Sequence, residues 1–516
     1  MPEIKINNNS ITCQSNETVL DVANRAGIHI PTMCWIKDFK PSTSCMVCVV
    51  QDKRNNKIIT SCSALVEDGM DIITNNEEVL DMRKSALELL LSEHQGDCEA
   101  PCQRVCPAEM DIPLMNRLIA ANKMDEAIHI VRETIALPEI LGYICPAPCE
   151  KACRRKDIDE AVSICLLKRF TAETDLKSVE KIQKSLTAQN VAIIGAGPAG
   201  LAAAFYLVQK GYNCDIFDSN ELAGGKMRTD IVEEKLPQYV LDKEIERIKS
   251  MGVNFYQNQT IDASTIIDSL SEKYQFIVFA VGSEKTIETE NFEKTNLSEL
   301  KELEIFRVKN CPIFVPKQIS YKSKMAVRAT ASGRKCSEWI LMFIESGIVS
   351  TPEKKFNSVY NRIKDEEQAE FLKDAENHDV RIQTETYLKG FTIEQAISEA
   401  GRCLHCDCRK KDNCSLRTQS SNYKASQRVY TLAQPANMQK NTEHPEIVLE
   451  TLKCIKCGIC IQTAQNTNDS TGFAFSGRGF DVKISIPIEK SINNLSKFTA
   501  ISCAKNCPTG AISIKK

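Results

Sequence analysis

Closely spaced cysteines are the residues of this chain best suited to chemistry. The sequence has 516 residues and 24 cysteines, most of which lie in short clusters. Thiolates a few residues apart converge easily on one soft metal centre, whereas a disulfide framework needs an oxidising compartment that nothing in the sequence suggests. The chain is therefore expected to hold several metal or iron–sulfur centres. The predicted ligands are Cys34, Cys45, Cys48, Cys62, His94, Cys98, Cys102, Cys106, Cys145, Cys149, Cys153, Cys165, Cys403, Cys406, Cys408, Cys414, Cys454, Cys457, Cys460 and Cys507.

Length and composition set the broad class. A chain of 516 residues is too long for one core, and about three to five domains are expected. Lys and Arg total 65 against 68 Asp and Glu, and no basic block interleaved with aromatic residues occurs, so no nucleic-acid partner is expected. No apolar run is long enough to span a bilayer, and the first residues lack the apolar segment of a signal peptide. These features predict a soluble, cytoplasmic protein without membrane insertion.

Residues 1–90 carry the first cluster, Cys34, Cys45, Cys48 and Cys62. Four thiolates suffice for a [2Fe-2S] cluster. A structural zinc site is the alternative, but zinc usually takes two compact ligand pairs, and the outlying Cys34 fits a ferredoxin loop better. The spacing resembles the N-terminal [2Fe-2S] domain of the large iron–sulfur subunit of respiratory complex I and of some hydrogenase and formate dehydrogenase subunits. That resemblance implies a β-grasp ferredoxin fold.

Residues 91–188 are predicted to form a helical two-cluster [4Fe-4S] domain. Helical periodicity runs over residues 79–91 and 112–134, with cysteines at the ends of these segments, so the ligands are expected on loops. The cysteine runs resemble the N-terminal iron–sulfur domain of the glutamate synthase small subunit and of dihydropyrimidine dehydrogenase, in which two halves interleave. The resemblance implies one group of Cys98, Cys102 and Cys153 and another of Cys106, Cys145 and Cys149.

Each of these two groups lacks a fourth ligand. His94 stands where the family has its first cysteine, and imidazole can replace thiolate at iron; a solvated histidine at a helix end is the alternative. Cys165 lies at a suitable distance to complete the second group, and a buried structural cysteine is the alternative there. The nearby Lys168 is a poor ligand.

Residues 189–345 contain the pattern of a dinucleotide-binding fold. An apolar strand runs into Gly-x-Gly-x-x-Gly, a helix follows, and a second strand ends in an acidic residue. The glycines permit a tight turn, close approach to a pyrophosphate and helix packing, and the helix N-terminus faces the negative charge. A later Gly-Gly-Lys resembles the second flavin contact loop of the glutamate synthase-type reductases, and residues 276–285 resemble their later Gly-bearing strand. The predicted FAD contacts are Gly195, Gly197, Gly200, Asp218, Gly225 and Lys226.

The same region departs from those reductases. Relatives with a pyridine-nucleotide domain insert a second GxGxxG unit, and here only a short polar stretch takes its place. The segment near the isoalloxazine ring, residues 230–237, and the Gly-Asp that meets the ribityl chain, around residues 314–318, are also replaced. The pattern predicts bound FAD without an NAD(P)H domain. A relic Rossmann domain that only spaces the clusters is the alternative.

Residues 346–400 are predicted as a helical connector, ahead of a C-terminal region, 401–516, that opens with four cysteines. Cys403, Cys406, Cys408 and Cys414 can bind zinc or a cubane cluster, and the neighbouring clusters favour [4Fe-4S]. His405 is expected to be a bystander.

The end of this C-terminal region is predicted to be a [4Fe-4S] ferredoxin-like domain. Cys454, Cys457 and Cys460 form the compact half of a bacterial ferredoxin motif, and the remote Cys507, which precedes a proline, completes the site. Cys503 is then a surplus thiol. The segment between these runs again resembles the complex I and hydrogenase subunits.

The sequence as a whole predicts a multidomain α+β and α/β electron-transfer protein. We expect one [2Fe-2S] cluster, three or four [4Fe-4S] clusters and one FAD, in a subunit of a cytoplasmic oxidoreductase complex. No nucleophile–base constellation stands out, so no catalytic residue is predicted. Nicotinamide, formate, hydrogen or aldehyde chemistry is expected from a partner subunit, with ferredoxin as a further carrier. The alternatives are a self-contained NAD(P)H-dependent reductase of the glutamate synthase small-subunit type and a non-redox zinc scaffold.

Overall fold

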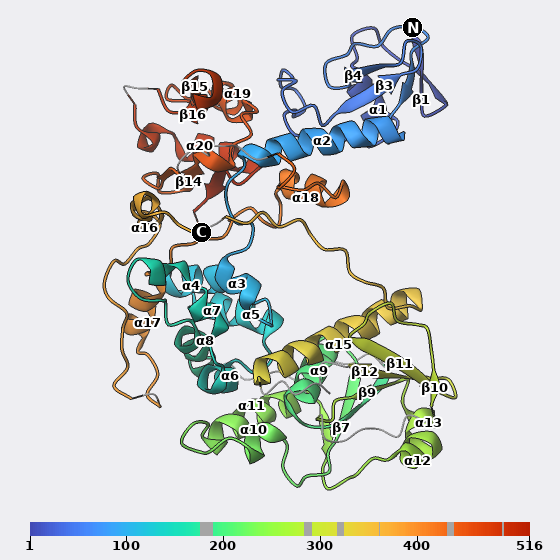
Figure 1. Cartoon of the computed structure of the whole chain (residues 1–516), viewed down its shortest axis with the longest axis vertical. Helices are drawn as coiled ribbons and strands as arrows, with labels where there is room; N and C mark the ends of the chain where they lie inside the picture. Colours follow the sequence, from blue (N-terminus) through green and yellow to red (C-terminus); the bar gives the residue numbers. More distant parts are fainter. Residues whose placement is uncertain are drawn as a thin grey trace. The chain divides into compact units, whose positions relative to one another are not determined.

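The computed structural model describes residues 1–175, 189–282, 292–316, 325–360, 362–386, 388–430, 438–487 and 490–515. The chain forms two compact units (Figure 1). Unit 1 comprises Met1–Ala100, Lys354–Ala375 and Leu404–Lys516, and unit 2 comprises Pro101–Glu353 and Glu376–Cys403. Both units are therefore built from segments that are discontinuous in sequence. The domain limits at residues 90, 188, 345 and 400 remain sequence-based predictions.

A five-stranded sheet organises the N-terminal part of unit 1, in the order β2-β1-β5-β3-β4. Its strands are β1 (Glu3–Ile6), β2 (Asn9–Thr12), β3 (Val49–Asp52), β4 (Lys57–Thr60) and β5 (Asp71–Ile73). Helix α1 (Val19–Arg25) begins at a capping box between Thr18 and Asp21, which satisfies its first backbone donors. The helix packs its apolar face on the sheet, together with Ile4 and Ile6 of β1. The loop from α1 to β3 is thereby held at both ends.

Unit 1 continues with the long helix α2 (Glu77–Glu93) and ends in a small mixed domain. Arg83 of α2 donates from Nε and Nη2 to the Val49 carbonyl, which ties the helix to β3. The C-terminal part has a sheet ordered β13-β14-β17 and a hairpin of β15 and β16. Its elements are β13 (Lys440–Asn441), β14 (Ile447–Glu450), α19 (Ile459–Asn466), β15 (Ala474–Ser476), β16 (Lys483–Ser485), α20 (Lys497–Asn506) and β17 (Ile512–Ile514).

Unit 2 opens with short helices joined by loops that bear cysteines. They are α3 (Pro101–Val105), α4 (Ile112–Ala120), α5 (Met124–Thr134), α6 (Pro138–Ile144), α7 (Pro148–Lys151) and α8 (Ile164–Glu173). The helical segment expected over residues 112–134 is interrupted between α4 and α5, where Asn122 takes a positive φ of 57°. Asparagine tolerates this left-handed conformation, which helix interiors do not allow.

A seven-stranded sheet, ordered β10-β11-β12-β9-β6-β7-β8, forms the rest of unit 2. Its strands are β6 (Asn190–Ile194), β7 (Asn213–Phe217), β8 (Asn254–Tyr256), β9 (Phe276–Phe279), β10 (Glu293–Lys294), β11 (Leu303–Val308) and β12 (Cys311–Pro316). β12, β9, β6, β7 and β8 are parallel, and β10 and β11 are antiparallel additions at one edge. This confirms the predicted combination of α+β and Rossmann-like α/β architecture.

Two helices cross closely on this sheet because a glycine lies at their contact. α9 (Pro198–Gln209) follows β6, and α15 (Ala326–Ser346) packs against it. A side chain at Gly333 of α15 would run into the backbone carbonyl of Ala199. The close contact buries the apolar face of α15, including Trp339, in the core of unit 2.

A buried acid gives unit 2 an expected pH dependence. Glu244 on α11 (Gln238–Ser250) accepts a hydrogen bond from the Ile140 backbone at 2.9 Å, and burial raises its pKa from 4.5 to about 7. The folded state therefore holds this proton over a range in which the unfolded chain has lost it, so stability falls as pH rises. Through this group, the wild-type free energy of unfolding is expected to fall by about 2 kcal/mol between about pH 5.5 and about pH 8. Glu244→Gln is expected to abolish this fall.

Denaturant unfolding followed by Trp339 fluorescence in a Trp35→Phe background measures this effect, since the chain has two tryptophans. Glu246→Gln is the matched control on the same helix, because that side chain is 70% exposed. An identical pH slope in wild type and the Glu244 variant would contradict the prediction.

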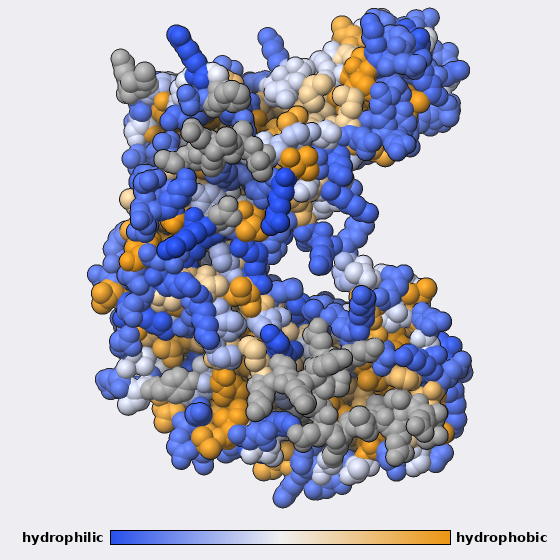
Figure 2. All heavy atoms as spheres, in the orientation of Figure 1, coloured by the Kyte–Doolittle hydropathy of each residue, from blue (hydrophilic) through white to orange (hydrophobic). Residues whose placement is uncertain are grey.

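No helix among the described residues is long and apolar enough to cross a membrane. The face shown in Figure 2 is mostly hydrophilic, with small apolar areas between charged side chains.

Candidate metal centres and dinucleotide site

Four buried thiols form one group beside the N-terminal sheet of unit 1. Cys48 precedes β3 and Cys62 follows β4, so the antiparallel pair brings them together. A hydrogen bond from Cys45 lowers the pKa of the Cys34 thiol to about 6, and one from Cys62 lowers that of Cys48 to about 7. The same hydrogen bonds, with burial, raise the pKa of Cys45 and Cys62. The charge of Cys34 also acts on Cys48 and Cys62, which joins the two pairs into one site.

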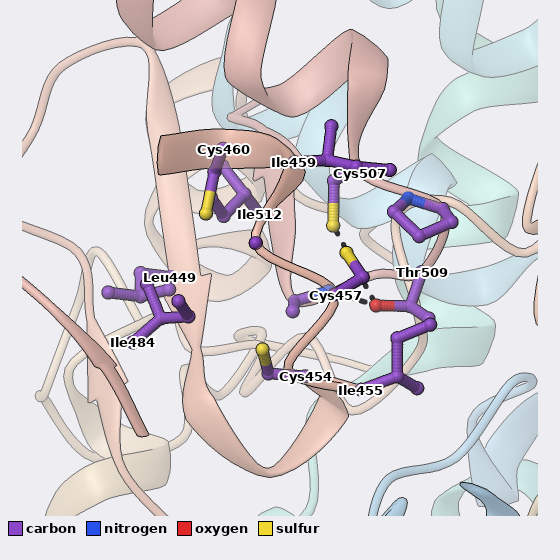
Figure 3. A pocket seen from close by; sticks show the side chains of 13 residues that line it. Leu449, Cys454, Ile455, Cys457, Ile459, Cys460, Ile484, Cys507, Thr509 and Ile512 are labelled. Atoms are coloured by element: carbon purple, nitrogen blue, oxygen red, sulfur yellow. Dashed lines mark hydrogen bonds between the residues drawn. The ribbon is translucent and has the colours of Figure 1, made fainter. Parts of the chain in front are cut away.

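A small pocket lies between the C-terminal cysteines of unit 1. Figure 3 shows Cys454, Cys457, Cys460 and Cys507 around it, with aliphatic side chains between them. The first three lie at the start of α19, where Gly458 provides a left-handed turn (φ 73°), and Cys507 ends α20. Burial raises the pKa of Cys454 to about 11. The residues that line the pocket include no acid, so its donors suit a thiolate-bound cluster.

A third group in unit 1 joins residues that are distant in sequence. The Cys408 amide donates to the Cys98 carbonyl at 3.1 Å, and the charges of both cysteines act on Cys414. Burial raises the pKa of Cys98 to about 11 and that of Cys414 to about 12. The ammonium group of Lys453 acts electrostatically on Cys98 and Cys408.

His94 lies beside the same lysine. It ends α2, is 7% exposed, and its Nδ1 has no hydrogen-bond partner in the described part of the chain. Burial and then the charge of Lys453 lower its pKa to about 4, so the ring is neutral at physiological pH. A neutral, buried imidazole with an unused nitrogen is suited to ligate a metal. His94 is therefore not the solvated histidine at a helix end that the sequence left as an alternative.

This grouping differs from the two expected from sequence. Cys98 was expected with Cys102 and Cys153, and Cys408 and Cys414 with Cys403. Instead Cys98 packs with Cys408 and Cys414, because residues 1–100 and 404–516 fold into the same unit. A side chain at Gly510 would run into the Cys408 sulfur, so a glycine is required where the last loop passes this group.

The three thiol groups of unit 1 contribute to one buried apolar cluster. Cys34 and Cys45 of the first group, Cys457 of the second and Cys414 of the third belong to one buried apolar cluster. The charge of Cys34 contributes to the raised pKa of Cys457. Lys410 donates to the Cys507 carbonyl, which holds the loop between Cys408 and Cys414 against the end of α20.

A fourth group lies in unit 2, on the loops around α6, α7 and α8. The Cys145 and Cys149 thiols each hydrogen-bond Cys165, and the charges of these three and of Cys106 act on Lys168. Burial lowers the pKa of Lys168, but the four cysteines raise it by more. Cys165 thus lies with Cys106, Cys145 and Cys149, the group that lacks a fourth ligand in the sequence-based grouping.

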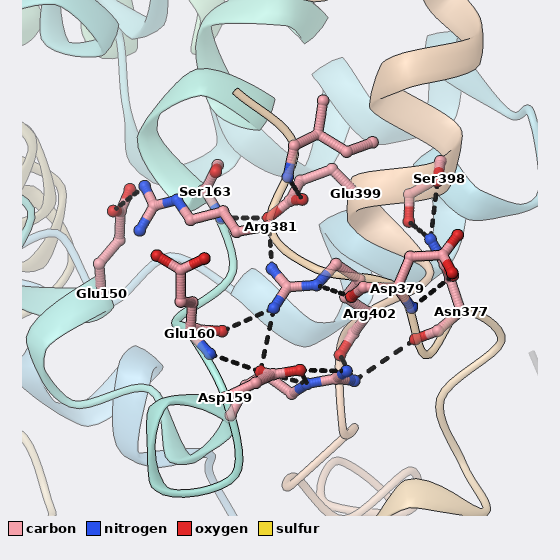
Figure 4. Close-up of polar contacts among 12 residues, drawn as sticks. Glu150, Asp159, Glu160, Ser163, Asn377, Asp379, Arg381, Ser398, Glu399 and Arg402 are labelled. Carbon is pink, nitrogen blue, oxygen red and sulfur yellow. Dashed lines mark hydrogen bonds and ion pairs between the residues drawn. The ribbon is translucent and has the colours of Figure 1, made fainter. Parts of the chain in front are cut away.

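A buried polar network fixes the end of unit 2 next to this region (Figure 4). Glu399 accepts from the Ser163 amide at 2.8 Å and from Arg402 at 2.9 Å, and Arg402 also bonds Asp159 at 3.0 Å. Arg155 donates to the Arg402 carbonyl at 3.0 Å. Since Cys403 follows Arg402 and Cys153 precedes Arg155 by two residues, the network brings these two stretches of chain together. Cys102 lies on α3 in the same unit, and Cys406 lies in unit 1.

The glycine-rich turn of unit 2 has the geometry of a phosphate cradle. Gly195 has a φ of 111°, and a Cβ there would lie 2.7 Å from the Ala280 carbonyl. A Cβ at Gly200 would overlap the Gly195 carbonyl, whereas one at Gly197, the N-cap of α9, would meet nothing within 4 Å. The first and third glycines are therefore required by the fold. The second leaves an open space at a helix N-terminus, where a pyrophosphate fits.

The second glycine loop closes over the first. Gly225 has a φ of 52°, and a Cβ there would lie 2.9 Å from the Gly197 Cα. Lys226 begins α10 (Lys226–Thr229), and its side chain approaches Gly282 after β9. The remainder of the expected Gly-bearing segment, residues 283–285, and residues 317–318 of the altered ribityl segment lie outside the described residues.

Asp218 already has backbone partners. One carboxylate oxygen accepts from the Ala196 amide at 2.6 Å, and the other accepts from the backbone and side chain of Asn220 at 2.8 Å. The carboxylate therefore links the glycine turn to the end of β7. Oδ2, which accepts only the Ala196 bond, has a second lone pair for the ribose hydroxyl that the sequence predicts Asp218 to bind.

Among the described residues, no three His, Cys, Asp or Glu side chains are placed to hold one ion. Zinc draws its thiolates to about 2.3 Å from one point, whereas a cluster spreads them around several irons.

Sequence reasoning weighed Lys168 only as a poor ligand and missed the charge that it and Lys453 place beside the thiols. Lys168 follows Cys165 by three positions on α8, a spacing that places both on one helix face, so it could have been found. Lys453 and its partner Glu450, 2.6 Å away, carry no such local signal.

Three protein families match consecutive parts of the chain. Residues 2–77 match a 2Fe-2S iron–sulfur cluster binding domain, residues 89–180 match dihydropyrimidine dehydrogenase domain II with its 4Fe-4S cluster, and residues 193–258 match an NAD(P)-binding Rossmann-like domain. The chain therefore contains regions similar to a 2Fe-2S domain, a 4Fe-4S domain and a Rossmann-like domain.

Its curated relatives include subunits of oxidoreductases. The chain is 35% identical over 192 residues to the NADPH-Fe(3+) oxidoreductase subunit beta of Geobacter sulfurreducens, and 35% identical over 207 residues to the NADP(+)-dependent formate dehydrogenase subunit beta of Moorella thermoacetica. Each match covers 36% of this chain and 29% of the relative. The glutamate synthase [NADPH] small chain of Bacillus subtilis is 32% identical over 183 residues, which is 35% of this chain and 37% of that protein. The chain thus spans about a third of the length of these relatives.

Proposed function

We propose that this chain is an electron-transferring iron–sulfur flavoprotein subunit of a cytoplasmic, multi-subunit oxidoreductase. The observation that carries the proposal is that members of three thiol groups belong to one buried apolar cluster in unit 1. Iron–sulfur clusters carry single electrons, and FAD exchanges two electrons with a substrate or carrier. The residues of this chain hold such centres close together in a water-poor core.

The contacts support specific ligand sets. In unit 1, Cys34, Cys45, Cys48 and Cys62 would hold a [2Fe-2S] cluster, and two further sets would each hold a [4Fe-4S] cluster. These two sets are Cys454, Cys457, Cys460 and Cys507, and His94, Cys98, Cys408 and Cys414.

In unit 2, Cys106, Cys145, Cys149 and Cys165 would hold another [4Fe-4S] cluster. Cys102, Cys153 and Cys403 remain as further thiolate ligands of this unit, and Cys406 remains a predicted ligand of its own unit.

The dinucleotide site is proposed to bind FAD through its adenosine and pyrophosphate half. Gly197 leaves room for the pyrophosphate, the N-terminus of α9 favours its charge, and Lys226 and Asp218 lie at the two ends of the cradle. Among the described residues the seven-stranded sheet offers one such glycine turn. We propose that a partner subunit supplies the terminal nicotinamide, formate, hydrogen or aldehyde chemistry. Relatives named as beta subunits of NADPH- and formate-linked oxidoreductases support this arrangement.

Anaerobic purification of the native assembly tests the proposal. We expect about 14 to about 18 irons and a matching amount of acid-labile sulfide per chain, since one [2Fe-2S] and three or four [4Fe-4S] clusters require them. One FAD and co-purifying subunits are also expected. Zinc without iron, or a colourless protein with no electron paramagnetic resonance (EPR) signal after dithionite, would overturn the proposal. NADPH-driven dye reduction by the isolated chain would favour a self-contained reductase.

A further inference from the structure

One buried ammonium group faces the thiols of unit 2. Lys168 on α8 is 3% exposed, its Nζ donates to the Leu141 carbonyl at 3.1 Å, and the Cys165 sulfur lies 3.9 Å from it. The groups that act on its charge are the thiols of Cys165, Cys145, Cys149 and Cys106. No carboxylate among the described residues forms an ion pair with it.

Glu150, the acid that bonds the Cys165 amide, forms its ion pair with Arg381. Glu150 accepts from the Cys165 amide at 2.9 Å through one oxygen and from Arg381 at 2.9 Å through the other. Within the described part of the chain, the ammonium group of Lys168 therefore has no ion-paired carboxylate. Burying an isolated charge is costly unless an opposite charge lies close by. A four-iron core bound by four thiolates carries net negative charge and provides that opposite charge.

Lys168 also connects this group to the dinucleotide fold. The carbonyl it bonds belongs to α6, and Leu137 and Ile140 of the same helix are part of the apolar core shared with the Rossmann-like strands. The cysteine group that Lys168 faces thus adjoins the helix that packs on the Rossmann-like core.

We propose that Lys168 is the counter-cation of the iron–sulfur cluster held by Cys106, Cys145, Cys149 and Cys165, and that its charge raises the reduction potential of that cluster. The inference rests on the proposed function. In the step concerned, one electron from a low-potential reductant, such as reduced flavin or dithionite, enters the cluster, and no bond or proton is transferred. The added negative charge is stabilised by the fixed ammonium group, so reduction becomes more favourable.

Unit 1 offers a matched comparison. Lys453 likewise lies beside thiols, but Glu450 pairs with it at 2.6 Å, and both side chains are buried. Removing this pair together removes no net charge. Lys168 differs from Lys453 in having no such acid.

The test is an EPR-monitored redox titration of the reconstituted full chain. Cys165→Ser alters the ligand set of the relevant cluster and so identifies its signal. In Lys168→Met, the equilibrium constant for one-electron reduction of this cluster is expected to fall at least tenfold, about 59 mV. Lys168→Arg keeps the charge and is expected to stay within threefold of wild type. The double variant Glu450→Gln, Lys453→Met is expected to leave the reduction of the unit 2 cluster unchanged. It is also expected to change the equilibrium constant for reduction of the unit 1 cluster beside Lys453 less than threefold.

The outcomes separate this inference from the proposed function. Loss of the cluster in Lys168→Met with retention in Lys168→Arg supports the inference, because the charge is then required for assembly. An unchanged potential in the methionine variant, or the same effect of arginine and methionine, overturns it. Either result leaves the proposed function standing as long as the wild-type chain binds iron and sulfide. A wild-type chain without clusters overturns both.

Discussion

Alanine in place of Cys98 or of Cys408 is expected to abolish one and the same four-iron EPR signal, although the two residues lie in distant parts of the sequence. The Cys408 amide bonds the Cys98 carbonyl, and both act on Cys414, so all three face one centre. Each variant should lose about four irons and four sulfides per chain. Parallel EPR spectra and iron assays of the dithionite-reduced variants measure this.

The control for this prediction is Cys403→Ala, which lies in the same short cysteine run as Cys408 but belongs to the other unit. Its EPR spectrum should retain the signal that the Cys98 and Cys408 variants lose. His94→Cys should keep the cluster with altered g-values, since thiolate replaces imidazole as a ligand. If Cys98→Ala and Cys153→Ala remove the same signal, the grouping drawn from the structure is wrong.

Gly197→Val is expected to lower FAD affinity at least 100-fold, about 2.7 kcal/mol, while leaving the free energy of unfolding of the apoprotein within about 1 kcal/mol of wild type. The backbone at Gly197 has a φ of −77° that any residue adopts, and a Cβ there meets no protein atom within 4 Å. The added side chain would instead occupy the space in which the pyrophosphate fits. Flavin content after reconstitution and titration with FAD measure the affinity.

Gly200→Ala is the matched control because its Cβ overlaps the Gly195 carbonyl. That variant should be destabilised by about 1–3 kcal/mol, as judged by denaturant unfolding at Trp339. The two glycines thus separate ligand binding from folding. Equal FAD binding by wild type and Gly197→Val would contradict a pyrophosphate at this turn and leave the relic Rossmann domain as the better description.

Local spacing was sufficient for the parts of the protein whose contacts are local. The glycine turn between β6 and α9 and the cysteines at the start of α19 were found because a turn and its ligands lie within a few residues of each other. The ferredoxin-like, helical iron–sulfur and Rossmann-like domains are also matched by known families. The break at Asn122 was missed because the apolar periodicity continues across it.

The ligand groups were harder to predict because their members come from separate segments. Cys403, Cys406, Cys408 and Cys414 look like one site in sequence, yet Cys408 and Cys414 pack with Cys98. The family resemblance predicts Cys98 with Cys102 and Cys153, whereas the fold places Cys98 in the same unit as Cys408 and Cys414. Whether His94 is solvated or buried was likewise decided by the packing of α2 against the C-terminal region.

The sequence by itself determined the kind of chemistry: thiols at ferredoxin spacing and a glycine turn between a strand and a helix, because these depend on a few consecutive residues. Only the tertiary structure decided which thiols lie together, that Lys168 is buried with no ion-paired acid among the described residues, and that three groups share one apolar cluster. Such contacts result from the summed packing of distant segments, and no single local pattern encodes them.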